Sequence, residues 1–140
     1  MIKVLGYEHM SWCVDDPQRP AEILALFGLK EAQTDPLPGL GVIATCYEGD
    51  NDVRFELIRP SNASSHLHKF LQTRGPGLHH VCFQVDNLED ACAQVKSAGG
   101  EIIGEVFADT RGRHAFVHPR STGGVLIGMI ELFPQFRKDK

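Results

Sequence analysis

The sequence predicts an α+β fold built from two similar βαβββ modules. Two matching segments lead to this prediction, because each sets one histidine, His9 or His80, at the head of a short strand in which apolar and polar residues alternate. The two histidines are 71 residues apart in a chain of 140, so the second half repeats the first. In each half the strand is followed by one helical pattern and three further strand patterns.

The first half contains its five elements in the order βαβββ. A strand over 9–14 precedes a helix over Pro17–Phe27, with Asp16 as the expected N-cap and Gly28 as the C-terminal stop. Three strands are predicted after this helix, at 29–34, 41–47 and 53–58.

The second half has the same order. The strand His80–Val85 leads into a helix over Leu88–Ala98 that ends at Gly99. The following strands are predicted at 101–106, 114–118 and 125–131, and a short helix at about 64–74 joins the halves. We therefore expect a single domain over 1–140, with module one at about 5–60 and module two at about 78–133.

Composition and charge narrow the functional classes. The net charge is −4 and the pI about 5.9, without a basic stripe, which argues against nucleic acid as a partner. No run approaches the roughly 18 apolar residues of a membrane span. The N-terminus has no long apolar signal segment, so a cytoplasmic location is expected. The four cysteines form no C-x-x-C pair and are expected to be buried free thiols.

Three side chains suggest a metal site. Residues two apart in a strand share a face, so His9 and His80 are expected on the face away from the helices. Glu56 lies between Phe55 and Leu57, and a buried carboxylate is costly unless it is paired or bound to a cation. His9, Glu56 and His80 together suit one divalent ion among Zn, Co, Ni, Fe and Mn, with positions left for water or substrate.

The sequence resembles the vicinal oxygen chelate (glyoxalase/bleomycin resistance/dioxygenase) superfamily, and within it the methylmalonyl-CoA epimerase branch. The resemblance extends through nearly the whole chain. Its most specific parts are Phe55–Pro60, Lys69–Val81 and His118–Ile127. It implies that the two modules form one open, cup-shaped mixed sheet around one divalent metal held by His9, Glu56 and His80.

The resemblance also implies a function. The expected activity is epimerisation or isomerisation of a methylmalonyl-CoA-like acyl-CoA through a metal-stabilised enolate. Lys69, Arg74 and Arg120 are candidates for binding the phosphates of coenzyme A, and Arg54 is a candidate for a substrate carboxylate. A homodimer is expected as well, since it would cover the edge strands.

The chain departs from the family at the fourth metal ligand. The family has an acidic residue directly after Gly-Val-Leu-Ile, and this chain has Gly128, which the internal repeat makes the counterpart of Glu56. A second family glutamate falls near Gly39, where this chain also lacks an acid.

Three residues are therefore candidate replacements for the missing catalytic acids. They are His114, His118 and Glu131. A glycine at 128 is expected to leave room for either imidazole to approach the metal. Glu131 is expected on the opposite face of its strand unless a bulge changes the register.

Three other functions fit the same residues. Two histidines and one carboxylate also describe non-haem iron dioxygenases. A glyoxalase-type lyase is a further metal-dependent possibility. The non-enzymatic alternative is a small-molecule-binding protein of the resistance type, which the missing acids would favour.

Overall fold

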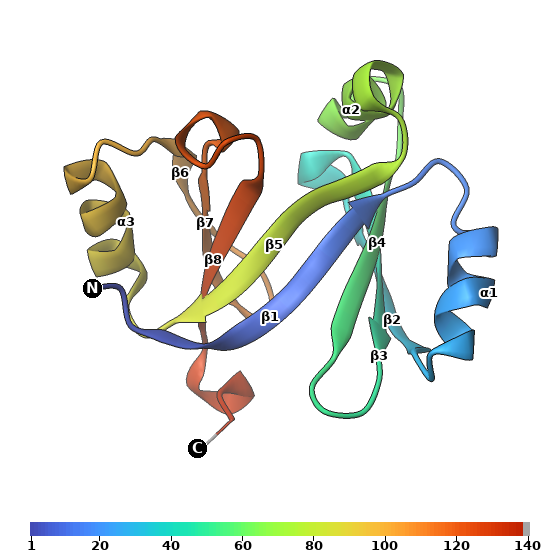
Figure 1. Cartoon of the computed structure of the whole chain (residues 1–140), viewed down its shortest axis with the longest axis horizontal. Coiled ribbons are helices and arrows are strands. Elements are labelled where there is room, and N and C mark those ends of the chain that lie inside the picture. The colour runs from blue at the N-terminus through green and yellow to red at the C-terminus, as the bar shows by residue number, and fades with distance from the viewer. Residues whose placement is uncertain (139–140) are drawn as a thin grey trace. The chain divides into compact units, whose positions relative to one another are not determined.

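The computed structural model describes residues 1–138 and contains eight strands and three α-helices in that range (Figure 1). In chain order they are β1 Val4–Cys13, α1 Gln18–Leu26, β2 Lys30–Leu37, β3 Val42–Glu48, β4 Arg54–Pro60, α2 His66–Arg74, β5 Gly77–Val85, α3 Leu88–Ser97, β6 Ile102–Ala108, β7 Gly112–Val117 and β8 Leu126–Leu132. Each half has the order βαβββ. The structure thus confirms the α+β class and the repeated order of elements.

The chain folds as two compact units. The first module is His9–His79, and the second module is Met1–Glu8 together with the chain from His80 onward. The chain therefore passes between modules immediately before His9 and immediately before His80. Residues before His9 belong to the second module, and the Gln84 side chain of that module donates to the Glu8 carboxylate at 2.7 Å.

The sheet of the first module has the strand order β2-β3-β4-β1. β1 runs parallel to β4, whereas β3 is antiparallel to both β2 and β4. One face carries α1 over a cluster of Val14, Leu29, Tyr47 and Leu57. The other face carries α2 over a cluster of Cys13, Val42, Ala44, Ile58 and Leu67. Both faces of this small sheet are therefore partly covered by helices.

The sheet of the second module has the order β1-β5-β8-β7-β6, with β5 parallel to β8 and antiparallel pairs beyond it. α3 begins at Asn87, whose side chain accepts the N–H of Asp90 at 2.8 Å. Its apolar side packs on the sheet in a cluster of Val85, Leu88, Ala91, Cys92, Ala115, Val117 and Met129. This packing leaves the other face of β5 and β8 to carry the polar side chains described below.

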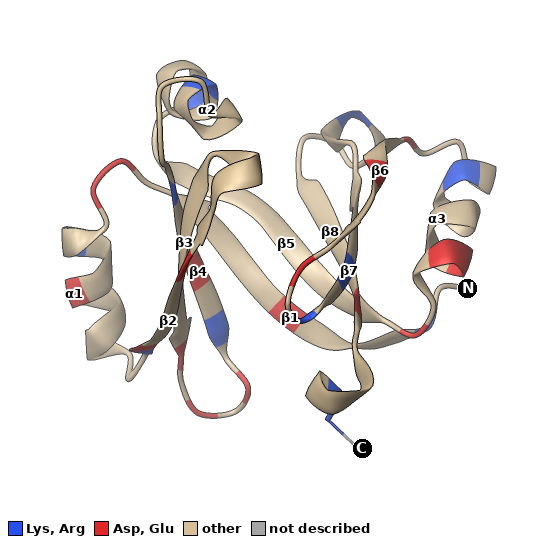
Figure 2. Ribbon diagram, turned by 180° about the vertical axis from the view of Figure 1, so that it is seen from behind, with Lys and Arg blue, Asp and Glu red and all other residues tan. Residues whose placement is uncertain are grey.

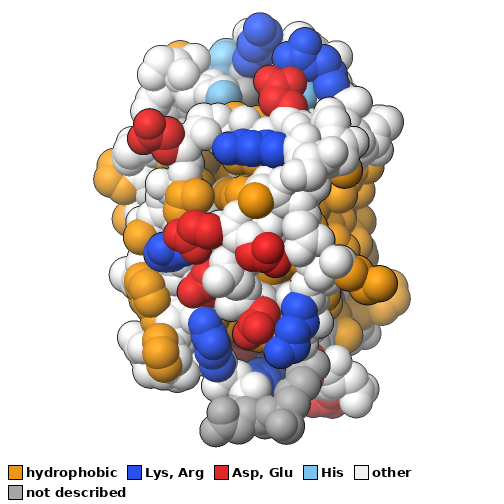
Figure 3. Space-filling view, turned by 90° about the vertical axis from the view of Figure 1, so that its left-hand side faces the viewer, with side chains coloured by type: hydrophobic (Ala, Val, Ile, Leu, Met, Phe, Trp, Pro, Cys, Tyr) orange, Lys and Arg blue, Asp and Glu red, His pale blue; other side chains and the backbone are white. Residues whose placement is uncertain are grey.

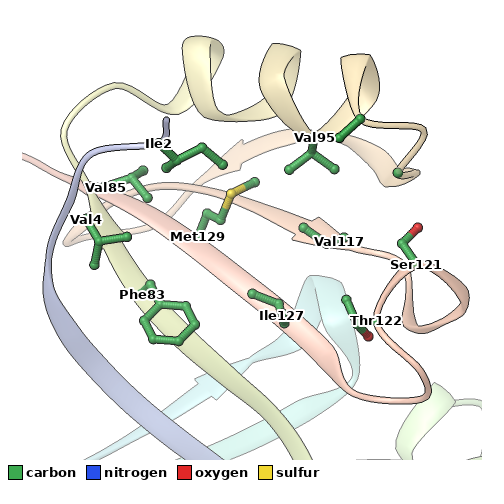
Figure 4. A pocket seen from close by; sticks show the side chains of 12 residues that line it. Ile2, Val4, Phe83, Val85, Val95, Val117, Ser121, Thr122, Ile127 and Met129 are labelled. Atoms are coloured by element: carbon green, nitrogen blue, oxygen red, sulfur yellow. The ribbon is translucent and has the colours of Figure 1, made fainter.

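An apolar groove of about 360 Å³ lies beside α3 on the helix-covered face of this sheet (Figure 4). Phe83, Val85, Ile127 and Met129 contribute to its floor, and Val95 of α3 forms part of its wall. Residues two apart share a face, so the groove lies on the side of β5 opposite to His80. None of the predicted metal ligands lines this groove.

Among residues 1–138, no helix is both long enough and apolar enough to cross a membrane.

Candidate active site

The first module brings two of the predicted metal ligands together. β1 and β4 are paired in parallel with Ser11 level with Glu56, which sets His9 one step away on the same face. The His9 Nε2 and Glu56 Oε1 atoms are 3.7 Å apart, and His9 is 9% exposed. This distance is too long for a hydrogen bond. It fits two ligands that share one ion, since ligand atoms about 2.0–2.2 Å from zinc lie roughly 3–4 Å from each other.

Ser11 completes this arrangement. Its hydroxyl donates to Glu56 Oε1 at 2.7 Å, and the residue has no exposed surface. The Glu56 side chain is 22% exposed, so it is less buried than the sequence predicts, and the Ser11 hydroxyl offsets part of the desolvation of its carboxylate. Ser11 was missed as a site residue in the sequence. The available signal was its position two residues after His9, on the same strand face.

The second module places His80 in the equivalent position. His80 is 7% exposed and lies on β5, which pairs in parallel with β8 so that Cys82 is level with Gly128. The ring of Phe116 on β7 meets the His80 ring nearly at right angles, with 5.4 Å between centroids. Aromatic pairs favour this edge-to-face arrangement. Phe116 therefore holds the orientation of His80.

The strand registers confirm that Gly128 is the counterpart of Glu56. Each lies level with the residue two positions after its module's histidine, Ser11 in one case and Cys82 in the other. The predicted room for an imidazole beside Gly128 is wrong. A Cβ added there would lie 3.1 Å from Cys82 Sγ and 3.2 Å from a Phe116 ring carbon, because those two side chains already fill the space.

Glu131 has structural partners on the helix-covered side of the second module. Its Oε2 accepts the backbone N–H of Leu88, the first residue of α3, at 2.8 Å. The carboxylate also lies 3.5 Å from the Arg113 guanidinium and 3.7 Å from that of Arg137. A carboxylate at a helix N-terminus is stabilised by the unpaired N–H groups there. These contacts give Glu131 a role in anchoring α3 to β8.

His114 pairs with an aspartate at the β6–β7 turn. Its Nε2 lies 2.8 Å from Asp109 Oδ2, and its ring stacks on Phe107 with 5.1 Å between centroids. Burial alone would raise the pKa of Asp109, but the nearby His114 and the backbone N–H of Gly112 outweigh it, so the pKa is lowered. Asp109 was not predicted. Its contacts identify it as a turn residue that also orients His114.

His118 begins the short turn after β7. Its Nδ1 accepts the backbone N–H of Arg120 at 3.1 Å, which fixes the orientation of the ring. The antiparallel β7–β8 register ends with the pair Val117 and Ile127, so His118 directly follows the last paired residue of β7. His114 lies four residues earlier in the chain, roughly 13 Å away at the usual strand rise.

Arg54 lies on the same face of β4 as Glu56. Its Nε donates to Cys46 Sγ at 2.9 Å and lies 3.4 Å from the Glu48 carboxylate, and its side chain is 19% exposed. Burial raises the pKa of the Cys46 thiol, although Arg54 acts in the opposite direction. Figure 2 shows acidic residues along the β3–β4 connection that follows Glu48. The Arg54 guanidinium is thus a cationic group on the strand face that carries Glu56, a predicted metal ligand.

The three predicted phosphate-binding cations lie on exposed elements. Lys69 and Arg74 are on α2 of the first module, where the Arg74 guanidinium lies 5.6 Å from the centre of the Phe70 ring. Arg120 of the second module is 3.4 Å from Glu101. Acidic and basic side chains are interspersed on the face that Figure 3 shows. These positions do not by themselves show that the three cations bind the same phosphate group.

Comparison with known proteins identifies the family. Residues 8–117 match the family model described as the Glyoxalase/Bleomycin resistance protein/Dioxygenase superfamily. The chain belongs to this superfamily. Within it, the chain is 29% identical over 123 residues to the mitochondrial methylmalonyl-CoA epimerase of Homo sapiens, covering 85% of this chain and 69% of that protein.

Two further relatives show the breadth of the superfamily. The crystal structure of methylmalonyl-CoA epimerase from Mycobacterium tuberculosis is similar with a TM-score of 0.87 and 27% identity, covering 96% of this chain and 93% of that one. A 4-hydroxyphenylpyruvate dioxygenase from Pyricularia oryzae is 29% identical over 117 residues, which are 70% of this chain and 28% of that protein. The structural likeness to the epimerase extends over nearly the whole length of both chains.

Proposed function

We propose that this superfamily member is an acyl-CoA epimerase that depends on a divalent metal. The observation that carries the proposal is the pair of buried His9 and partly buried Glu56, 3.7 Å apart, in a chain similar to methylmalonyl-CoA epimerases over most of its length. The substrate class is an acyl-CoA whose α-carbon lies between two carbonyl groups. The hydrogen on such a carbon is acidic enough for an enzyme to remove and return it.

We assign the metal to His9, Glu56 and His80. Two imidazoles with one carboxylate suit Zn, Co, Ni, Fe or Mn. The Glu56 side chain is 22% exposed, and a carboxylate that is largely removed from water fits a cation because a positive partner offsets its desolvation. When bound, the metal would supply Lewis-acid stabilisation of the negative charge that develops on the thioester oxygen.

Other side chains are assigned to binding and proton transfer. Arg54 contacts Cys46 and Glu48 on the strand face that carries Glu56, and it would bind the substrate's free carboxylate, since guanidinium groups pair well with carboxylates. His118 is the proposed proton-transfer residue, because it directly follows Val117, whose partner Ile127 is next to Leu126, the register partner of His80, and because its ring is fixed through Nδ1. Lys69, Arg74 and Arg120 remain proposed contacts for the phosphates of coenzyme A.

The test is exchange of the α-hydrogen of methylmalonyl-CoA in deuterated water, followed by NMR. We expect exchange in the presence of metal, loss of exchange with a chelator, and recovery when metal is returned. The Arg54→Gln variant should raise KM more than it lowers kcat, whereas His118→Ala should mainly lower kcat. No exchange across a panel of malonyl-type acyl-CoAs would contradict the proposal, and binding without exchange would favour the resistance-type binding protein.

A second candidate is a non-haem iron dioxygenase. It is favoured by the two-histidine, one-carboxylate ligand set and by the similarity to a 4-hydroxyphenylpyruvate dioxygenase. Purified protein would then contain iron and consume oxygen with an oxoacid substrate. Oxygen uptake without α-hydrogen exchange would support this candidate over the epimerase. A glyoxalase-type lyase would instead act on a glutathione adduct and show neither result.

A further inference from the structure

Ser11 occupies a distinctive place in the first module. It has no exposed surface, it lies level with Glu56 in the parallel β1–β4 pair, and its hydroxyl donates to Glu56 Oε1 at 2.7 Å. The bond joins two strands through side chains that share one sheet face. It is short, as expected for a hydroxyl that donates to an ionised carboxylate.

This bond restricts a flexible side chain. Glutamate has three rotatable side-chain bonds, and the last of these has a broad preference, so the carboxylate plane is not fixed by its own rotamer. The Ser11 hydroxyl fixes one oxygen, and the His9 ring lies 3.7 Å from that same oxygen. Because Ser11 is fully buried, water cannot replace its hydroxyl without a change in packing.

We propose that Ser11 is a positioning residue that orients the Glu56 carboxylate for metal binding. This inference rests on the proposed metal site. Partners that hydrogen-bond to metal ligands fix their orientation, and their loss typically weakens metal binding by about 10- to 100-fold. Ser11 acts through Glu56 and has no direct part in the chemistry.

The second module provides an internal comparison. Cys82 stands where Ser11 stands in the first module, and the residue level with it is Gly128, so there is no carboxylate to orient. A thiol is only a weak donor, and Cys82 is 2% exposed in an apolar cluster with Ile130 and Leu132. The hydroxyl therefore occurs in the module that has a carboxylate at this register position.

The experiment measures metal affinity by competition with a chromogenic chelator, using Zn²⁺ or Co²⁺ and purified full-length protein. The variants are Ser11→Ala, Ser11→Thr and, as a matched control, Cys13→Ala. Cys13 is also fully buried, on the same face of the same strand, and packs in an apolar cluster. Thermal unfolding of each metal-free variant reports on the fold independently of the metal.

We expect Ser11→Ala to bind metal about 10- to 100-fold more weakly than the wild type. Cys13→Ala should lower the unfolding temperature without this loss, and Ser11→Thr should recover most of the affinity because it keeps the hydroxyl. Equal affinities for Ser11→Ala and Cys13→Ala would overturn the inference alone. Failure of the wild-type protein to bind metal would overturn the proposed metal site, and this inference with it.

Discussion

The two modules share one backbone arrangement and differ in the residues around their histidines. In each, a parallel strand pair places one residue level with the position two after a buried histidine, and that residue is Glu56 in the first module and Gly128 in the second. The first module orients its carboxylate with Ser11, and the second fills the equivalent space with Cys82 and Phe116. The repeated fold therefore does not require a repeated ligand set.

This difference follows from packing on the polar face of each sheet. A carboxylate is retained where a hydroxyl can satisfy it and a histidine lies nearby. Where the carboxylate is missing, the glycine has no side chain, and the ring of Phe116 occupies the space against His80. Protein interiors are close-packed, so an absent side chain is replaced by its neighbours instead of leaving a void.

The largest expected effect is the loss of metal binding when a ligand of the first module is removed. Glu56→Ala should weaken Zn²⁺ or Co²⁺ binding by more than the roughly 10- to 100-fold expected for a supporting partner. The measurement is chelator competition. Glu48→Ala is the matched control, because that carboxylate is on the neighbouring strand and is 55% exposed. Similar affinities in the two variants would remove Glu56 from the ligand set.

The comparison can be tested directly by making the second module resemble the first. Gly128→Glu should destabilise the metal-free protein by about 1–3 kcal/mol, because its Cβ would crowd Cys82 and Phe116. Combining it with Phe116→Ala should cost less than the sum of the two single changes. Urea unfolding in a double-mutant cycle measures this coupling. Additive effects would show that Phe116 does not fill the space beside Gly128.

The residues that precede the two histidines also differ between modules. Glu8, before His9, is buried and ion-paired with Arg111. His79, before His80, packs against Phe70 with 5.1 Å between ring centroids. Burial, followed by the charges of His66 and Arg74, lowers the pKa of His79 from 6.5 to about 4. One position therefore holds a charged side chain and the other holds a neutral one.

This pKa gives the pH dependence a definite sign. The unfolded chain takes up a proton at His79 first as the pH falls, so stability is present above pH 6.5 and is lost between 6.5 and about 4. The loss should be on the order of 2 kcal/mol, less than the full shift implies, because the ring is partly exposed. His79→Phe should flatten this part of the stability curve of the metal-free protein. The measurement is urea unfolding at a series of pH values. If the free energy of unfolding of His79→Phe depended on pH as steeply as that of the wild type, the prediction would be contradicted.

The smallest expected effect concerns Glu131. Glu131→Gln should lower the free energy of unfolding by about 1–2 kcal/mol, because the Leu88 N–H and the Arg113 guanidinium lose a charged acceptor. Metal affinity and α-hydrogen exchange should stay unchanged. A selective loss of exchange at unchanged stability would instead return Glu131 to the list of catalytic candidates.

Much of this protein could be predicted from local sequence patterns. Helix α3 was expected over Leu88–Ala98 and is found over Leu88–Ser97, because apolar periodicity and Gly99 define it locally. The spacing of the repeat also predicts that Gly128 occupies the position equivalent to Glu56, and the strand registers confirm it. Period-two alternation correctly placed Glu131 on the face opposite to the candidate metal ligands.

The sequence by itself determined the repeated βαβββ order and the residue types available to a metal, since both depend on periodicity and on chemistry that is encoded locally. Only the tertiary structure decided which side chains surround Glu56 in the first module and Gly128 in the second. Ser11 donates to Glu56 and Phe116 fills the space beside Gly128 through contacts 45 and 12 residues apart in the chain. Such contacts depend on strand register and close packing across the sheet, which no local pattern specifies.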